Sequence, residues 1–172
     1  MLKILIIAGA RPNFMKIAPI IRALSNAPHI EHKIVHTGQH YDAAMSQNFF
    51  DELGIPEPHY NLEVGSGSHA QQTANIMTRF EEVCIAEKPG IVMVVGDVNS
   101  TVACGLVAKK LHVELAHVEA GLRSNDRSMP EEINRLVTDS ISDYLFVTEK
   151  NGIENLKKKD IPPKQSILSA MS

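Results

Sequence analysis

Short apolar runs alternate with helical patterns along this chain of 172 residues. The first run, residues 2–8, is mostly leucine and isoleucine, which is typical of a strand buried on both faces. We expect strands at residues 2–8, 33–37, 91–95, 113–118 and 144–147, and helices at residues 13–24, 41–53, 68–88, 99–111, 128–142 and 148–159. This alternation predicts an α/β fold, a three-layer α/β/α domain with a parallel sheet covered by helices on both sides.

Local signals place the ends of several of these helices. Pro19 has no backbone N–H, so we expect a first turn at residues 13–16 and a kink or a restart of the helix at Pro19. Ser68 and Gln71 form the pattern of a capping box at the start of the third helix. We expect Asn99 or Ser100 to cap the fourth helix, because both residue types are favoured at that position.

The composition excludes several classes of protein. The chain has 17 Lys and Arg against 20 Asp and Glu, a net charge of -3, 5% aromatic residues and no Trp. Nucleic-acid-binding proteins usually carry a basic excess, and those that bind single strands use aromatic stacking, so we expect no nucleic-acid partner. The apolar run at residues 4–10 is too short to cross a membrane and has no cleavage site, so we expect neither a membrane span nor a signal peptide.

The two cysteines indicate the compartment. Cys84 and Cys104 stand in apolar surroundings and lack the spacing of metal ligands. They are typical of reduced core thiols in a cytoplasmic protein. The length of the chain suits a single domain with its own core.

Ligands of open parallel sheets bind beyond the carboxyl ends of the strands, so the residues that follow each strand are site candidates. Gly9 follows the first strand, and a glycine turn at the start of a helix suits an anion. Arg11 and Lys16 add two positive charges nearby. The segment has neither the dinucleotide fingerprint nor the P-loop pattern. From local pattern alone, Arg11 and Lys16 are equally well interpreted as ordinary surface residues or as residues that bind an anion.

A polar turn follows the second strand. It contains His36 and His40, four residues apart, with Gln39 beside them. The two histidines lie across a glycine turn, and no cysteine or carboxylate cluster completes a metal site. We therefore expect ligand contact or helix capping here, and no metal.

Acidic residues follow the next two strands. Asp97 either caps a helix or directs a carboxylate into the cleft. Glu119 ends its strand before a glycine turn, where a carboxylate costs free energy unless it is paired or protonated. His117, within the same strand, is most simply a hydrogen-bonded core histidine.

The helix at residues 128–142 adds further charges. Glu131 and Arg135 are four residues apart, so they share one face and can form a pair worth roughly 0.2–0.5 kcal/mol if exposed. Glu131 also fits the third position of a capping box, which is a sufficient local explanation of it. Together, the strand ends and this helix gather three carboxylates and three cations near one edge of the sheet. Such a site suits a phosphorylated substrate and a proton-transfer reaction.

Five motifs follow one another in order along the chain. They are Gly-Ala-Arg-Pro-Asn-Phe-Met-Lys at 9–16, Thr-Gly-Gln-His at 37–40, Gly-Asp-Val-Asn-Ser-Thr at 96–101, His-Val-Glu-Ala-Gly-Leu-Arg at 117–123 and Met-Pro-Glu-Glu-Ile-Asn-Arg at 129–135. Together they resemble the non-hydrolysing UDP-N-acetylglucosamine 2-epimerases, which have the glycosyltransferase-B (GT-B) fold of two Rossmann-like lobes with the active site in the cleft between them. By this resemblance, residues 1–165 form the amino-terminal lobe, and residues 166–172 begin the crossover to a carboxyl-terminal lobe that the chain lacks.

The resemblance also implies an activity. Members of the family interconvert UDP-N-acetylglucosamine and UDP-N-acetylmannosamine for cell-surface polysaccharide, by eliminating UDP to a 2-acetamidoglucal and adding it back. The catalytic carboxylates implied are Asp97, Glu119 and Glu131. The substrate-binding cations implied are Arg11, Lys16 and Arg135, the last also orienting Glu131. No cofactor is implied, and the complete enzyme is expected to be a homodimer whose second lobe supplies most nucleotide contacts.

The sequence leaves several finer assignments open. Gln39, His40 and Gln72 resemble a second, regulatory substrate site of some bacterial relatives. The segment 65–69 resembles a subgroup that includes epimerases of UDP-2,3-diacetamido-glucuronic acid. The same chain is also compatible with one half of a GT-B glycosyltransferase, with a hydrolysing relative that releases N-acetylmannosamine, and with a non-catalytic fragment or partner.

Overall fold

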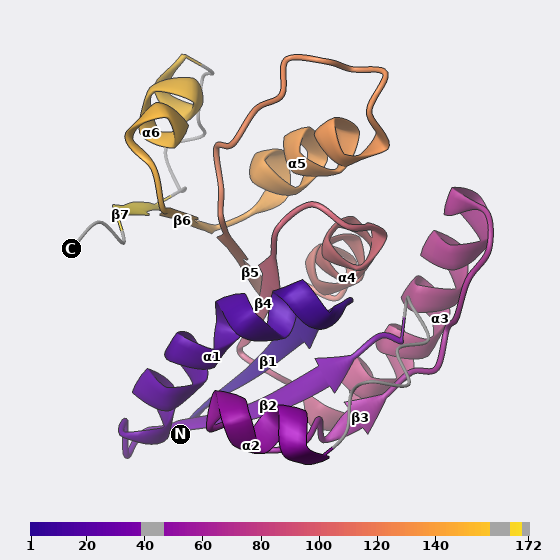
Figure 1. Ribbon diagram of the computed structural model, residues 1–172, viewed down its shortest axis with the longest axis vertical. Helices are drawn as coiled ribbons and strands as arrows, with labels where there is room; N and C mark the ends of the chain where they lie inside the picture. Colours follow the sequence, from indigo (N-terminus) through magenta and orange to yellow (C-terminus); the bar gives the residue numbers. More distant parts are fainter. Residues whose placement is uncertain (39–46, 159–165, 170–172) are drawn as a thin grey trace.

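The structure is a computed structural model that describes residues 1–38, 47–158 and 166–169. Its strands are β1 (Leu2–Ala8), β2 (Ile30–His36), β3 (Tyr60–Asn61), β4 (Ile91–Val95), β5 (Glu114–Val118), β6 (Tyr144–Val147) and β7 (Ser166–Ser169). Its helices are α1 (Arg11–Ser25), α2 (Gln47–Leu53), α3 (His69–Glu87), α4 (Asn99–Lys110), α5 (Pro130–Ile141) and α6 (Lys150–Lys157) (Figure 1).

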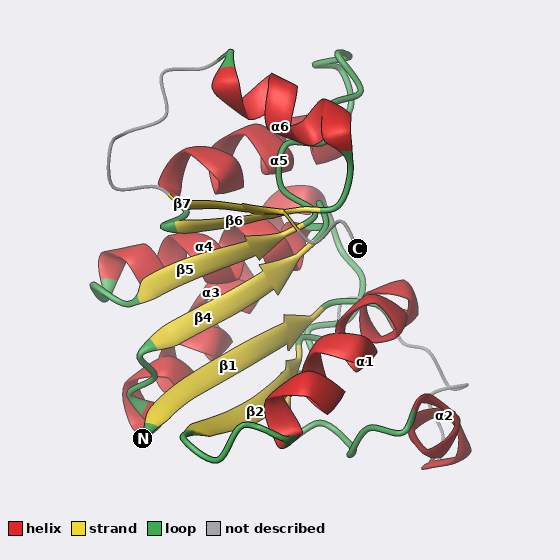
Figure 2. Ribbon diagram, turned by 90° about the vertical axis from the view of Figure 1, so that its left-hand side faces the viewer, coloured by secondary structure: helices red, strands yellow, loops and turns green. Residues whose placement is uncertain are grey.

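The strands described form one parallel sheet in the order β3-β2-β1-β4-β5-β6-β7. Figure 2 shows α1 in front of this sheet and α3 and α4 behind it. The expected three-layer α/β/α arrangement is therefore confirmed. Strands β2 and β3 lie on one side of β1, and strands β4 to β7 lie on its other side. The carboxyl ends of β1 and β4 thus flank a topological switch point, where open parallel sheets form their ligand crevice.

Alternate residues of β1 face the two helical layers. Ile6 belongs to the same buried cluster as Phe14 of α1. Ile7, on the other face, belongs to the cluster that contains Phe80 of α3. Because both faces of the strand are covered, every position needs an apolar side chain, which explains the unbroken apolar run at residues 4–8.

Two expectations from composition can be compared with the structure. Cys84 and Cys104 are free and buried in the layer behind the sheet, as expected of core thiols. Burial raises the pKa of Cys84 to about 11, so this thiol stays neutral and unreactive at neutral pH. In the part of the chain that the structure describes, no helix is long and apolar enough to span a bilayer.

Helix α1 runs unbroken from Arg11 to Ser25, so it does not restart at Pro19. The proline deprives the carbonyl of Met15 of its intrahelical partner. Met15 and Pro19 are both exposed, so water can bind that carbonyl. On the opposite face, Ile17 and Ile21 are fully buried against the sheet. Tertiary packing on both sides of the proline therefore outweighs the local penalty.

The residue that precedes the helix is the expected one at α3 and a different one at α4 and α5. Ser68 caps α3, where its hydroxyl accepts a hydrogen bond from the backbone N–H of Gln71 at 3.2 Å. The residue before α4 is Val98, so neither Asn99 nor Ser100 caps it. The side chains of those two residues bind partners on other elements instead. In α5 the preceding residue is Met129, which makes Glu131 the second helical residue rather than the third.

Two short strands were not anticipated by the sequence pattern. Strand β3 pairs with β2 through Val35 and Tyr60, between the helices expected at residues 41–53 and 68–88. Strand β7 pairs with β6 along Ser166–Ser169, which the sequence assigns to the crossover. Both are edge strands of four residues or fewer, too short to show a period of two.

A buried carboxylate joins the amino-terminal half of the sheet to the end of α3. Glu87, only 8% exposed, accepts hydrogen bonds from Lys33 Nζ at 2.8 Å, Lys3 Nζ at 2.9 Å and the hydroxyl of Tyr60. The Lys33 bond, the Tyr60 bond and the Lys3 bond lower the pKa of Glu87 from 4.5 to about 2. A carboxylate with a depressed pKa stabilises the folded state above its unfolded pKa and loses that contribution as the pH falls toward 2.

We predict that Glu87→Gln lowers the free energy of unfolding at pH 7 by on the order of 2 kcal/mol. The difference between wild type and variant should shrink between pH 5 and pH 2, because the wild-type carboxylate then becomes protonated. Urea unfolding at several pH values measures it. Glu82→Gln, at an exposed position of the same helix, is the control and should change stability by less than about 0.5 kcal/mol at pH 7. A pH-independent difference for Glu87→Gln would contradict the assignment.

Candidate active site

The turn after β1 packs tightly against the start of α4. A Cβ atom on Gly9 would lie 2.6 Å from Ser100 Oγ, so only glycine fits. The buried side chain of Asn13 accepts hydrogen bonds from the backbone N–H groups of Gly9 and Ala10, both at 3.0 Å. Ser100 in turn bonds Thr37 Oγ1 at 2.7 Å. These contacts fix the turns after β1, β2 and β4 relative to one another.

An ion pair joins α1 to the turn after β5. Lys16 Nζ lies 2.8 Å from Glu119 Oε2, and both side chains are partly exposed. Glu119 has a left-handed backbone with φ 68°, which is uncommon for a residue other than glycine and is found at functional sites. Gly96, also left-handed, lies beside the pair, since its Cβ position is 3.5 Å from Glu119 Oε2 and 3.8 Å from Lys16 Nζ.

A second ion pair joins the turn after β4 to α5. Arg135 donates to the carboxylate of Asp97 and, at 3.1 Å, to Glu132 Oε2. Asn134 donates to the carbonyl of Asp97 at 2.9 Å. Burial alone would lower the pKa of Arg135, but the carboxylates of Asp97 and Glu132 outweigh it and raise the pKa. Arg135 therefore remains a fixed positive charge at this turn.

The expected pairing of Arg135 with Glu131 is wrong. Arg135 reaches across to Asp97 on another element and to Glu132 on its own helix. Glu132 is buried, and the fold brings Asp97 close, so these two carboxylates bind the guanidinium in place of Glu131, one turn away. Arg135 thus orients Asp97 rather than Glu131.

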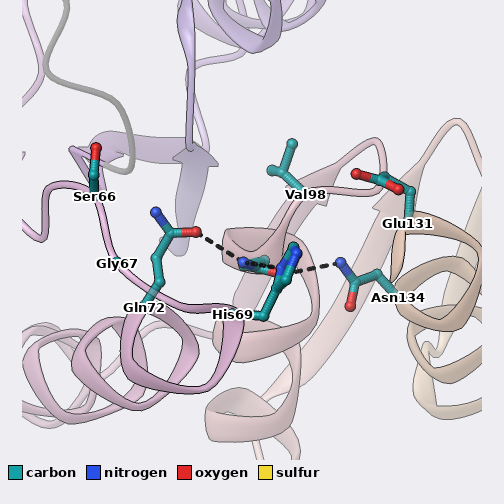
Figure 3. A pocket seen from close by; sticks show the side chains of 8 residues that line it. Ser66, Gly67, His69, Gln72, Val98, Glu131 and Asn134 are labelled. Carbon is teal, nitrogen blue, oxygen red and sulfur yellow. Dashed lines mark hydrogen bonds between the residues drawn. The ribbon is translucent and has the colours of Figure 1, made fainter. Parts of the chain in front are cut away.

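Glu131 instead lines a hollow of about 260 Å³. Figure 3 shows it across this hollow from Gln72. Polar side chains cross-link the floor: Asn99 Nδ2 donates to Gln72 Oε1 at 2.8 Å and lies 3.0 Å from His69 Nδ1. The side chain of Glu131 forms no hydrogen bond or ion pair with any residue in the described ranges. Its carboxylate is therefore available to a ligand. The other residues lining the hollow are Ser66, Gly67, Val98 and Asn134.

Arg11 contacts an aromatic ring. Its guanidinium sits 4.6 Å from the centre of the Phe49 ring, in a cation–π arrangement. Arg11 forms no hydrogen bond or ion pair with Asp97, Glu119 or Glu131. It does occupy the first residue of α1, next to the turn after β1. Gln39 and His40 lie outside the described residues.

His117 is a hydrogen-bonded core histidine, as expected. It is fully buried, with Nδ1 2.7 Å from Asp139 Oδ1 and Nε2 2.8 Å from the carbonyl oxygen of Gly96. Burial would raise the pKa of Asp139, but the His117 hydrogen bond and the charge of Arg123 outweigh it and lower the pKa. Within the described ranges, no group of three or more His, Cys, Asp or Glu side chains could hold a metal ion.

Sequence reasoning missed four polar residues that the fold brings to this edge of the sheet. They are Asn99, Arg123, Asn134 and Asp139. Three of them lie inside motifs that were noted for their charged neighbours. Asp139 lies outside these motifs, and Glu132, Arg135 and Ser142 share its helical face, so no local pattern marked it as a buried residue.

Comparison with known proteins places this arrangement in a family. A family model described as UDP-N-acetylglucosamine 2-epimerase matches residues 22–168. The chain belongs to the UDP-N-acetylglucosamine 2-epimerase family. A Methanococcus maripaludis protein named UDP-N-acetylglucosamine 2-epimerase homolog is 52% identical over 160 residues, which cover 93% of this chain and 44% of that protein. The Pseudomonas aeruginosa UDP-2,3-diacetamido-2,3-dideoxy-D-glucuronate 2-epimerase is 50% identical over 158 residues, 92% of this chain and 45% of that protein.

A solved structure of the family superimposes closely on this chain. The Methanocaldococcus jannaschii UDP-GlcNAc 2-epimerase, crystallised with UDP-GlcNAc and UDP, matches with a TM-score of 0.91 and 48% identity. The match covers 98% of this chain and 46% of that one. The chain therefore spans a little under half the length of these relatives, and the expected Rossmann-like half of a GT-B fold is confirmed.

We predict that Gly121→Ala destabilises the lobe by about 1–3 kcal/mol more than Gly54→Ala. Both glycines have positive φ, 80° and 64°, so both variants carry the left-handed penalty of about 1–2 kcal/mol. Only at Gly121 would the new Cβ also meet backbone, 2.4 Å from the carbonyl oxygen of Gly152, whereas nothing lies within 4 Å at Gly54. Urea unfolding of both variants measures the difference. Equal losses would contradict the close approach of the Glu119 turn to α6.

Proposed function

We propose that the complete protein interconverts UDP-N-acetylglucosamine and UDP-N-acetylmannosamine. The observation that carries this proposal is the pairing of carboxylates with cations at the switch point: Lys16 with Glu119, and Arg135 with Asp97. Glu131 lines the hollow nearby without a partner among the described residues. The family membership and the names of the relatives support the same reaction.

The chemistry explains why several carboxylates are needed. The hydrogen on carbon 2 of the sugar is not acidic, because no carbonyl is conjugated to it. Breaking the anomeric C–O bond first expels UDP and gives carbon 1 oxocarbenium character, which acidifies that hydrogen. Loss of the proton leaves a 2-acetamidoglucal. A proton added to the other face of carbon 2, with re-addition of UDP to carbon 1, completes the epimerisation.

Each group of side chains then has a distinct task. Carboxylates stabilise the cationic carbon and carry protons on both faces of the sugar. We assign these roles to Asp97, Glu119 and Glu131. Cations hold the leaving diphosphate. We assign that role to Arg11, Lys16 and Arg135.

The remaining assignments concern the whole enzyme. We infer a second lobe that provides most nucleotide contacts, a homodimeric assembly and a cytoplasmic location, the last in keeping with two free buried cysteines. We place the boundary of the amino-terminal lobe at residue 165 and the crossover at 166–172. Gln39 and His40, with Gln72 of the hollow, are assigned to a regulatory substrate site. The proposed reaction needs no cofactor.

We predict that Asp97→Asn, Glu119→Gln and Glu131→Gln each lower kcat of the complete enzyme by about 10²–10⁴-fold. Their melting temperatures should change far less, because none of the three side chains lies in the apolar core. Coupled assay of product formation and thermal unfolding give the two quantities. Glu57→Gln, an exposed position outside the site, is the control. Normal turnover in any one variant would remove that residue from the catalytic set.

A second substrate calls for a direct comparison, because one relative of 50% identity is named for UDP-2,3-diacetamido-2,3-dideoxy-D-glucuronate. We expect the complete enzyme, incubated in heavy water with each UDP-sugar in turn, to place deuterium on carbon 2 of its substrate. NMR and mass spectrometry measure the incorporation of deuterium, and the UDP-sugar that incorporates it faster is the preferred substrate. A glycosyltransferase would leave carbon 2 unlabelled, and a hydrolysing relative would release free N-acetylmannosamine. Either result, or no reaction with any UDP-sugar, would overturn the proposal.

A further inference from the structure

A buried polar network lies directly beneath the turns that carry Asp97 and Glu119. His117, on β5, is fully buried, yet its two ring nitrogens both face oxygen atoms. One oxygen is the carbonyl of Gly96, immediately before Asp97, and the other belongs to Asp139 of α5. Apolar side chains of similar volume would fill such a place without the cost of desolvating polar groups. Stability alone therefore does not account for this network.

Asp139 uses both carboxylate oxygens, and each binds a different element. Oδ1 faces His117 on β5. Oδ2 accepts the backbone N–H of Gly121 at 3.1 Å and lies 2.6 Å from Arg123 Nη2. Gly121 and Arg123 both belong to the turn that follows β5. This one side chain thus ties α5 to the Glu119 turn.

The network brackets a strained residue. Glu119 has a left-handed backbone, and such residues persist only where the surrounding structure holds them. The N–H of Ala120 donates to the carbonyl of Phe146 at 3.0 Å, and the next N–H, that of Gly121, donates to Asp139. On the amino-terminal side, His117 is fixed within the strand by the same carboxylate. The conformation that directs Glu119 toward Lys16 is therefore held from both sides.

We propose that His117 and Asp139 are a pair of positioning residues that hold the Asp97 and Glu119 carboxylates at a fixed separation. Neither residue lies at the surface where a substrate binds, since both are buried. They act through backbone: the Gly96 carbonyl for Asp97, and the Gly121 N–H for Glu119. The inference depends on the proposed function, because it assigns the two carboxylates to one reaction. Misplacing a catalytic group by about 1 Å can cost on the order of 10²-fold in rate.

The test uses Asp139→Asn in the complete enzyme, with Asp143→Asn as the matched control. Asp143 Oδ2 also accepts a backbone N–H of β5, that of Leu115 at 2.8 Å, and a cation, Lys109 Nζ at 2.7 Å. It does so at the opposite end of the strand from Glu119. We expect Asp139→Asn to lower kcat by about 10²-fold with KM changed less than about threefold. Asp143→Asn should leave kcat within about twofold, at a temperature where both variants are folded.

Two substitutions of His117 keep the proposal testable if Asp139→Asn does not fold. Gln retains an amide N–H near the position of Nε2, and Asn retains one near Nδ1. We expect His117→Gln to keep the contact with the Gly96 carbonyl and to lose the contact with Asp139, which holds the Glu119 turn. His117→Asn should keep the Asp139 contact and free the Asp97 turn. Both should lower kcat more than they change KM.

Amide hydrogen exchange measured by mass spectrometry reports the positioning without reference to activity. Exchange should quicken at residues 119–124 in Asp139→Asn and not in Asp143→Asn. If Asp139→Asn keeps normal kcat, or loses no more than Asp143→Asn, the positioning role is wrong. If the wild type exchanges no hydrogen at carbon 2 of any UDP-sugar, the proposed function fails instead. The positioning of the turn is then judged from amide exchange alone. Amide exchange at residues 119–124 that is the same in Asp139→Asn as in the wild type overturns it, and faster amide exchange in Asp139→Asn supports it.

Discussion

Every strand of the described sheet runs in the same direction, so every strand ends at the same edge. This constraint gathers segments that are about 100 residues apart in the chain, such as the start of α1, which carries Lys16, and the turn that carries Glu119. The reversal of strand order at β1 and β4 opens a crevice there, because the turns after these strands lead to helices on opposite faces. The charged residues that follow each strand share one place for this reason, and their chemistry depends on it.

Charges at this edge are held in cross-element pairs. Glu119 pairs with α1, and Asp97 pairs with α5. In a partly buried place an unpaired carboxylate is costly, and a cation delivered by another element lowers that cost while fixing the direction of the side chain. Glu131 differs, because no described residue binds its carboxylate. The edge therefore combines two oriented acids with a third that a ligand can engage.

Much of the fold was predictable from the sequence, and the failures have a common cause. The unbroken apolar run of β1 and the capping box at Ser68 depend on neighbours in the chain, so local rules described them correctly. Pro19 and Arg135 were misjudged because distant residues decide their behaviour. Packing of α1 on the sheet carries the helix through the proline, and the guanidinium prefers Asp97, 38 residues away, to a neighbour on its own helix.

The sequence by itself determined the α/β class, the direction of the strands and the family, because periodicity and short motifs are written in consecutive residues. Only the tertiary structure decided which acid meets which cation, and that a buried His117–Asp139 network underlies the two turns. Such pairings depend on distances of a few ångströms between elements far apart in the chain. Local pattern carries no measure of those distances, whereas packing of α1 and α5 against the sheet sets them.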